Sequence, residues 1–328
     1  MRDVVFICII ISQTLLGQTW QSIGPEQGIN QRGDSLHSMG YVSGIWRNPA
    51  NNQEIILSTN SSGIWKTTNR GFTWKSVTDK KALIPGMGSQ SFSQNPSNEN
   101  ELLAAAANYV YGNDNYKGRV LISNDKGDSW RIWESFEHPK DDEIIKLQYL
   151  TAQDILVVTK TRVYYTDDHG KSWETIFELK KELSHVQHEF QFLNDFIVFD
   201  NKNILLTSQH RWGNTGQVWR TNNLGKEWED ITSTVANDFD FVYAARLSEI
   251  HNDQAVLGIT DAKTVKLFNI TENGYKISYI DQFRTNYKTG DAKASKFEIE
   301  YSKINPNKIY LGFVEFFEWT KENGLVML

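Results

Sequence analysis

The chain has 328 residues with 34 Lys and Arg against 40 Asp and Glu, which gives a formal net charge of −6. This acidic balance argues against a nucleic-acid-binding protein, which needs a basic surface. The one cysteine, Cys8, lies in an N-terminal apolar segment, so the rest of the chain can form neither a disulfide framework nor a thiolate zinc site.

The first 17 residues are typical of a secretory signal. Arg2 precedes an apolar run over residues 4–16, and Gly17 is a small residue suited to cleavage before Gln18. The run is shorter than the roughly 20 residues of a membrane-spanning helix, and no other segment comes close. We therefore expect a secreted or cell-surface protein whose mature part is residues 18–328, and the absence of disulfides favours a bacterial extracellular protein. The alternative is that residues 1–17 form a buried first strand.

Four copies of one motif, Ser/Thr-x-Asp/Asn-x-Gly-x-x-Trp, run through the chain, at residues 67–74, 123–130, 166–173 and 221–228. Each copy lies between two apolar runs, which predicts a strand, a turn and a second strand. The Asp or Asn can accept hydrogen bonds from backbone N–H groups of its turn, the Gly supplies a positive φ, and the Trp can pack between neighbouring units. The positions expected to have a structural role are Asn69, Gly71, Trp74, Asp125, Gly127, Trp130, Asp168, Gly170, Trp173, Asn223, Gly225 and Trp228.

This motif resembles the Asp-box, or BNR, repeat. That repeat occurs in sialidases, in xyloglucan-cleaving glycoside hydrolases, in sortilin-type receptors and in a photosystem assembly factor. The resemblance implies an all-β fold, a β-propeller of four-stranded blades, with each box on the turn between the two outer strands of a blade. It also implies that the box is structural and does not bind a metal or take part in catalysis.

A longer unit of roughly 50 residues surrounds each box, and six such units fit the chain. The fifth unit keeps a turn at residues 269–275 but lacks the box Trp. In the sixth unit, residues 324–328 look like the strand that leads into a box, so an incomplete last blade is expected. A propeller normally closes so that no blade edge stays unpaired. The chain is therefore expected to be an N-terminal fragment of a longer propeller; alternatively, residues 20–38 supply the missing strand of a closed six-bladed ring.

Candidate ligand-binding residues lie in long connections between the second and third strands of units two, four and six, on the face opposite the boxes. Aromatic rings stack on sugars or anchor peptide side chains, and polar groups fix the orientation of a ligand. The alternative is that these aromatic side chains cover small cores of their own loops. The candidates are Tyr109, Tyr111, Asn113, Tyr116, His210, Arg211, Trp212 and, in the connection 315–320, Trp319.

The conspicuous acidic groups are Asp238 with Asp240, Glu298 with Glu300, and residues 141–143. Members of the first two pairs alternate with the period of a strand, so each pair would share one face if its segment is a strand. Solvated acids explain all three groups equally well.

Two classes of function follow. The first is a secreted, non-catalytic propeller, similar to sortilin-type propellers, that binds a polysaccharide or an extracellular protein through the aromatic-rich connections. The second is a glycoside hydrolase, since residues 41–65 are similar to the opening of xyloglucan-cleaving enzymes. In that family a catalytic Asp stands where this chain has Asn60, which cannot act as an acid or base, and the second acid lies in a later domain.

A sialidase would need an Arg-Ile-Pro segment, and Arg131-Ile132-Trp133 does not match it. Polysaccharide lyase and assembly-factor roles stay open. No cofactor and no metal site are expected, because the sequence has no histidine cluster with ligand spacing and no phosphate-binding loop.

Overall fold

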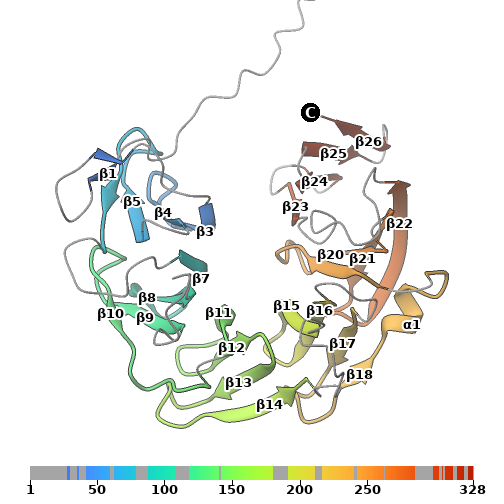
Figure 1. Cartoon of the computed structure of the whole chain (residues 1–328), viewed down its shortest axis with the longest axis horizontal. Helices are drawn as coiled ribbons and strands as arrows, with labels where there is room; N and C mark the ends of the chain where they lie inside the picture. The colour runs from blue at the N-terminus through green and yellow to red at the C-terminus, as the bar shows by residue number, and fades with distance from the viewer. Residues whose placement is uncertain are drawn as a thin grey trace, which may run out of the picture.

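Six four-stranded antiparallel sheets make up most of the molecule, and a two-stranded sheet of β1 (Gly28–Ile29) and β2 (Ser35–Leu36) accompanies them. The computed structural model describes residues 28–29, 35–36, 42–59, 63–78, 88–107, 118–139, 142–179, 191–210, 216–239, 242–261, 263–284, 298–302, 305, 307–312, 316–320 and 324–327. The six sheets are arranged as blades around an arc (Figure 1). The predicted β-propeller fold is therefore confirmed.

Each blade consists of four strands that follow one another along the chain. Blade 1 contains β3 (Val42–Arg47), β4 (Ile55–Thr59), β5 (Gly63–Thr67) and β6 (Lys75–Ser76), and blade 2 contains β7 (Gly88–Asn95), β8 (Asn98–Ala107), β9 (Arg119–Ser123) and β10 (Arg131–Ile132). Blade 3 contains β11 (Ile144–Tyr149), β12 (Ile155–Thr159), β13 (Arg162–Thr166) and β14 (Glu174–Glu178), and blade 4 contains β15 (Gln191–Phe199), β16 (Asn203–His210), β17 (Val218–Thr221) and β18 (Glu229–Asp230). Blade 5 contains β19 (Ala244–Leu247), β20 (Ala255–Thr260), β21 (Thr264–Thr271) and β22 (Lys276–Arg284), and blade 6 contains β23 (Glu298–Tyr301), β24 (Lys308–Gly312), β25 (Phe316–Thr320) and β26 (Gly324–Met327).

The blades stand side by side with their first strands on the inner side of the arc and their fourth strands on the outer rim (Figure 1). Strands with apolar residues on both faces, such as β12 with its sequence Ile-Leu-Val-Val-Thr, are buried along their whole length because a neighbouring blade covers each face. One apolar core lies at each junction between successive blades. The core between blades 2 and 3, for example, contains Leu103, Ile122, Leu147 and Val157. In the described part of the chain, blades 1 and 6 do not stand next to each other, and the arc is open between them (Figure 1).

The described residues contain one short helix, α1 (Thr232–Val235), in the connection from blade 4 to blade 5. Val235 is buried in the core between these two blades together with Ile231 and Ala236. Phe239, which follows the helix, packs against the same core. The helix therefore supplies apolar surface at the junction where the fifth blade has no box Trp.

Two expectations for the last blade were wrong. Residues 316–320 are not a loop but the strand β25, which pairs with β24, and residues 324–327 form the fourth strand, β26, so the sixth sheet has its four strands. The reason is that the last two units carry a different sequence in the place where the first four units carry an Asp box. The sequence Glu-Asn-Gly occurs at residues 272–274, between β21 and β22, and again at residues 322–324, just before β26. In the described copy, Glu272, Asn273 and Gly274 have φ values of 54°, 56° and 91°, which makes a tight hairpin turn without a box.

The inner strands also differ between the two ends of the arc. The first strands of blades 1 to 4 each contain a register shift with the second strand, as between Ile144 and Lys146 in β11. The first strands of blades 5 and 6, β19 and β23, pair with their neighbours without a shift. Blades 1 to 4 thus share both the Asp box and an inner bulge, and in the described residues blades 5 and 6 have neither.

Replacement of a box glycine by alanine is expected to destabilise the fold, and by more at Gly170 than at Gly127. Both glycines have positive φ, 77° and 85°, which costs an alanine about 1–2 kcal/mol. A Cβ on Gly170 would lie 2.6 Å from the ring of Trp133, whereas a Cβ on Gly127 would meet the flexible end of Ile56 at 2.4 Å. Overpacking against a ring that cannot move adds about 1–3 kcal/mol. Urea unfolding of Gly170→Ala and Gly127→Ala measures the difference, and equal losses would show that the Trp133 ring does not fix the spacing of blades 2 and 3.

Candidate functional site

The Asp boxes form closed hydrogen-bonded turns. In the third box, Thr166 Oγ1 donates to Asp168 Oδ1 at 2.8 Å and accepts from the backbone N–H of Gly170 at 2.9 Å. Asp168 Oδ1 accepts from the backbone N–H of Ser172 at 2.9 Å, and Oδ2 accepts from its hydroxyl at 2.7 Å. The backbone and side-chain bonds from Ser172, with the bond from Thr166, lower the pKa of Asp168 to about 2. A carboxylate that is saturated by its own turn is poorly suited to accept a proton in catalysis.

The other three boxes repeat this geometry. The central acceptors Asn69, Asp125 and Asn223 each accept a backbone N–H from the residue four positions on, at 2.9, 2.8 and 3.0 Å. The hydrogen bonds from Ser129 and Ser123 also lower the pKa of Asp125, although burial opposes this. These contacts favour the structural role predicted for the boxes.

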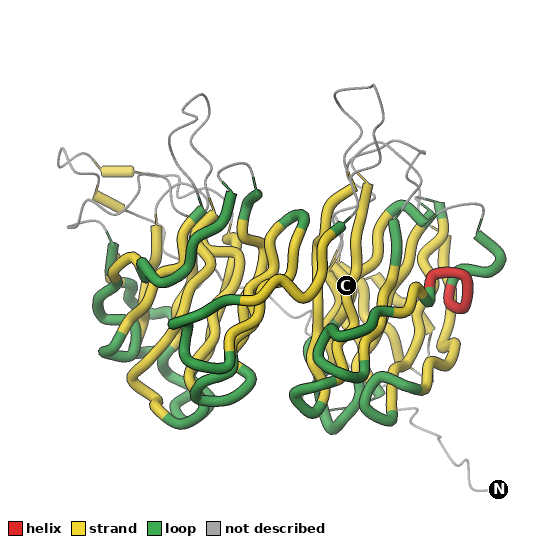
Figure 2. The backbone as a smooth tube through the Cα atoms, turned by 90° about the horizontal axis from the view of Figure 1, so that it is seen from below, coloured by secondary structure: helices red, strands yellow, loops and turns green. Residues whose placement is uncertain are grey.

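Each box is also tied to the turn between the first two strands of its own blade. The residue after the Asp or Asn has a positive φ, and its backbone N–H donates to a carbonyl of that turn, as His169 does to Gln153 at 2.9 Å. Arg70 and Leu224 make the equivalent bonds, and Lys126 donates to the carbonyl of Asn100 near the start of β8. The boxes and these turns therefore occupy the same end of the strands, at which most of the turns drawn in green in Figure 2 lie.

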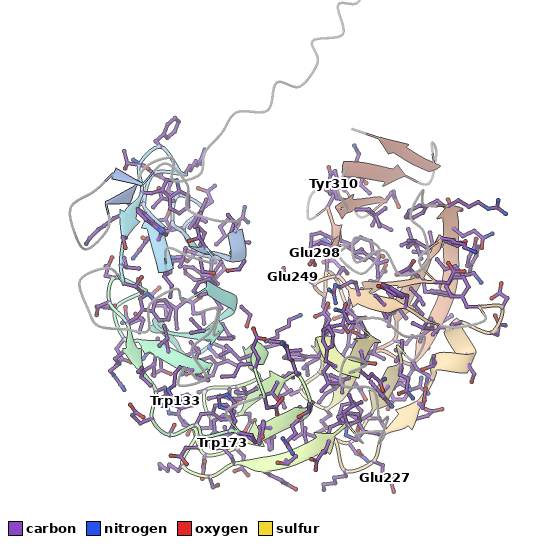
Figure 3. All side chains as sticks on the ribbon, viewed as in Figure 1. Trp133, Trp173, Glu227, Glu249, Glu298 and Tyr310 are labelled. Carbon is purple, nitrogen blue, oxygen red and sulfur yellow. The ribbon has the colours of Figure 1, made fainter. Side chains whose placement is uncertain are left out.

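Two of the box tryptophans donate hydrogen bonds to the preceding blade. Trp173 Nε1 donates to the carbonyl of Ser135 at 3.0 Å, and Trp228 Nε1 donates to the carbonyl of Ile176 at 2.9 Å. The ring of Trp173 meets the ring of Trp133 edge to face, with centroids 5.8 Å apart (Figure 3). Their large apolar surface therefore contributes to the junctions between blades, as the sequence predicted.

A cluster of titratable side chains joins blades 2 and 3. Glu101 Oε1 accepts from Asn95 Nδ2 at 2.8 Å, from the hydroxyl of Tyr149 at 2.5 Å and from His169 Nε2 at 2.9 Å. Burial alone would raise the pKa of Glu101, but the three hydrogen bonds together lower it. Burial and the neighbouring carboxylate raise the pKa of Tyr149. The phenol therefore stays protonated at neutral pH and cannot serve as an ionised nucleophile, and the cluster acts as a contact between blades.

A row of charged residues runs along the inner strands. Lys146 on β11 donates to Asp195 Oδ1 on β15 at 2.6 Å and to the carbonyl of Phe196 at 2.8 Å. Asp195 Oδ2 in turn accepts from the backbone N–H of Leu247 on β19 at 3.1 Å. Arg246 precedes Leu247 and continues the row. Lys146 and Asp195 thus clamp the inner strands of blades 3, 4 and 5 together.

Glu298 on β23 is the last member of this row. The surrounding protein raises its pKa, chiefly because the carboxylate loses hydration; Asp195 adds to the increase, while Arg246 and Lys146 oppose it. The side chain is nevertheless exposed, because it stands on the concave inner side of the arc, where Figure 3 also places Glu249. Since residues 298–301 form a strand, Glu298 and Glu300 share one face, as predicted, and Tyr310 is the cross-strand neighbour of Glu300.

The other predicted acids are held by protein groups. Asp142 is buried and accepts from the hydroxyl of Thr159 at 2.7 Å, the backbone N–H of Thr161 at 2.9 Å and Arg162 at 3.2 Å. Asp238 lies in a turn after α1 and not in a strand, and its ion pair with Lys266 lowers its pKa. Asp240, its expected partner, lies outside the described residues.

The structure describes few of the predicted ligand-binding residues. His210 is the last residue of β16 and stands opposite Gln191 on β15. Trp319 lies within β25, opposite Ile309, and is not on a loop as expected. The remaining candidates, and the position of Asn60, lie outside the described residues: Tyr109, Tyr111, Asn113, Tyr116, Arg211 and Trp212.

The inner hairpin of blade 4 is longer than the strands outside it. Strand β17 pairs with β16 from Thr221 opposite Ile204 to Val218 opposite Thr207, whereas β15 and β16 continue to pair as far as Gln191 opposite His210. Ser208 still donates its backbone N–H to the carbonyl of Gln217 at 2.9 Å, so residues 209–210 extend past the third strand, at the end of the blade opposite its Asp box. The chain then continues from His210 into the predicted segment Arg211-Trp212.

Sequence reasoning missed the Glu101 cluster and the charged inner row. A signal for the first was present, because Asn and Glu recur six residues apart at Asn48 and Glu54, which are hydrogen-bonded at 2.8 Å, and at Asn95 and Glu101. The charged inner row also had a signal in the sequence. The first strand of each of units three to six contains a charged residue directly before an apolar one: Lys146, Asp195, Arg246 and Glu298.

Among the described residues, no group of three or more His, Cys, Asp or Glu side chains is placed to hold a metal ion. No helix in the described part of the chain is long and apolar enough to cross a membrane.

The comparison with protein families gives one match, to the model described as Sortilin-Vps10 (sortilin, neurotensin receptor 3), over residues 118–302. This match covers more than half of the chain. The chain belongs to the Sortilin-Vps10 family. No curated protein matches the sequence.

Solved structures share the propeller fold of this sortilin-type chain. YCF48 bound to D1 peptide is 13% identical with a TM-score of 0.57, over 89% of this chain and 83% of that one. The GH74 enzyme of Niastella koreensis is 13% identical with a TM-score of 0.60, over 87% of this chain and 46% of that one. The GH74 xyloglucanase of Xanthomonas campestris is 11% identical with a TM-score of 0.53, over 88% and 54%. This chain thus spans about half the length of these two enzymes, and at such identities the likeness establishes the fold alone.

Replacement of Asp168 by Asn is expected to make the protein less sensitive to acid. Because the folded-state pKa is depressed to about 2 from the ordinary value of 3.8, the stability that Asp168 contributes is present above pH 3.8 and is lost as the pH falls toward 2. Asn69 shows that an amide fits the site, since its Nδ2 donates to the hydroxyl of Thr73 at 2.8 Å. Urea midpoints between pH 2 and pH 7 should fall less steeply for Asp168→Asn than for the wild type. The control Asp167→Asn removes the same charge from the neighbouring residue, and an equal effect there would contradict the assignment.

Replacement of Glu101 by Gln is expected to destabilise the junction between blades 2 and 3 by about 1–3 kcal/mol, because buried donors lose a charged acceptor. The control Glu99→Gln removes an exposed carboxylate that pairs with Lys126 at 2.6 Å, and an exposed pair is worth about 0–1 kcal/mol. Urea unfolding at pH 7 measures both variants. Similar losses for the two would show that the Glu101 cluster is no stronger than a surface ion pair.

Proposed function

We propose that this sortilin-type propeller is a secreted, non-catalytic binding protein that holds an extracellular polypeptide on the face opposite its Asp boxes. A glycan ligand on the same face is the alternative. Residues 1–17 direct secretion and are removed from the mature chain.

The observation that carries this proposal is the extended inner hairpin of blade 4. Strands β15 and β16 pair as far as Gln191 opposite His210, beyond the last pair of β16 with β17, at the end of the blade away from the boxes. Variable connections on a rigid scaffold are the usual place for a binding site. At the opposite end, the boxes and the turns beside them are occupied with one another. The occupied box turns therefore favour the end with the connections as the place of a binding site.

Two relatives support a polypeptide ligand. The description of the matching family names a receptor, neurotensin receptor 3. The similar structure of YCF48 contains a bound D1 peptide. The alternative of a glycan takes its support from the xyloglucanase of similar fold. The aromatic and amide residues of the predicted connections suit either ligand.

The mature chain, residues 18–328, is expected to select peptides from a displayed peptide library, and Trp212→Ala or Tyr111→Ala should weaken their binding at least tenfold. The matched control is Phe72→Ala, which removes an aromatic side chain that is 82% exposed in the first Asp box, on the opposite face. Binding constants are measured by fluorescence anisotropy after circular dichroism has shown that each variant is folded. Binding lost in Phe72→Ala and kept in the other two variants would place the site on the box face and overturn the proposal. Selection on a glycan array without peptide selection would favour the glycan alternative.

Glycoside hydrolysis is the second candidate, because Glu298 has a raised pKa and shares a strand face with Glu300. Two residues along a strand span about 6.6 Å, within the roughly 5–10 Å that separates the carboxylates of glycosidases. Against this, the position of the xyloglucanase acid holds Asn60, which cannot act as an acid or base.

A reducing-sugar assay with xyloglucan and other β-glucans is expected to show no release by the mature chain. If sugar is released, Glu298→Gln is compared with Glu227→Gln, which removes an exposed acid from the outer rim of the arc (Figure 3). Release that Glu298→Gln abolishes and Glu227→Gln leaves intact would make the protein a hydrolase and overturn the non-catalytic assignment.

A further inference from the structure

We draw no further inference here: the strongest candidate, the exposed carboxylate of Glu298 with Glu300 and Tyr310 on one face of the sixth blade, is an acidic cluster for which nothing in the described residues shows what covers or binds it.

Discussion

The fold depends on one repeated contact, in which the glycine of the second, third and fourth box turns presses against a side chain of the preceding blade. Only a residue without a Cβ fits, since a Cβ would lie 2.4–2.8 Å from the nearest atoms of Ile56, Trp133 and Ile176 at Gly127, Gly170 and Gly225. The same glycine needs a positive φ to close the turn. The box therefore sets the turn geometry and the spacing between blades through a single residue, which explains why the motif recurs with so little variation.

Blade 5 shows what the arc requires when the box is missing. Gly274 keeps a positive φ of 91°, and a Cβ there would lie 3.2 Å from Phe199 of the preceding blade, so the glycine contact survives in a looser form. The missing Trp is replaced by apolar residues around α1, including Val235, which enter the core between blades 4 and 5. The hairpin of β21 and β22 also lengthens. The close approach between blades is thus the constraint, and the box is one of two ways in which this chain meets it.

The sequence was informative where a pattern is local. The box motif predicted four of the turns, and the apolar runs on either side of each box predicted the strands that flank it, because both depend on residues within about ten positions. The sixth blade was misread because the sequence before its last strand is Glu-Asn-Gly and contains no Trp, so β25 looked like a loop and β26 like a third strand. The recurring Asn and Glu indicated only the local pair Asn95 and Glu101, because the other partners, Tyr149 and His169, lie 48 and 68 residues from Glu101. Their meeting follows from the packing of two blades, which a single repeat does not reveal.

The two ends of the blades differ in a way that bears on function, because one end carries the Asp boxes and the other carries the long connections. At the box end, the central acids Asp125 and Asp168 are already bonded within their own turns, so they are poorly placed to bind a ligand. Along the inner strands, Lys146 is hydrogen-bonded to blade 4 and Asp195 accepts a hydrogen bond from blade 5. These two charged residues therefore belong to the scaffold. A scaffold held this firmly at one end and along its inner side can tolerate long, variable connections at the other end without loss of register. Under the proposed binding role, ligand specificity would change through the residues that follow strands such as β16, while the boxes keep the blades in place.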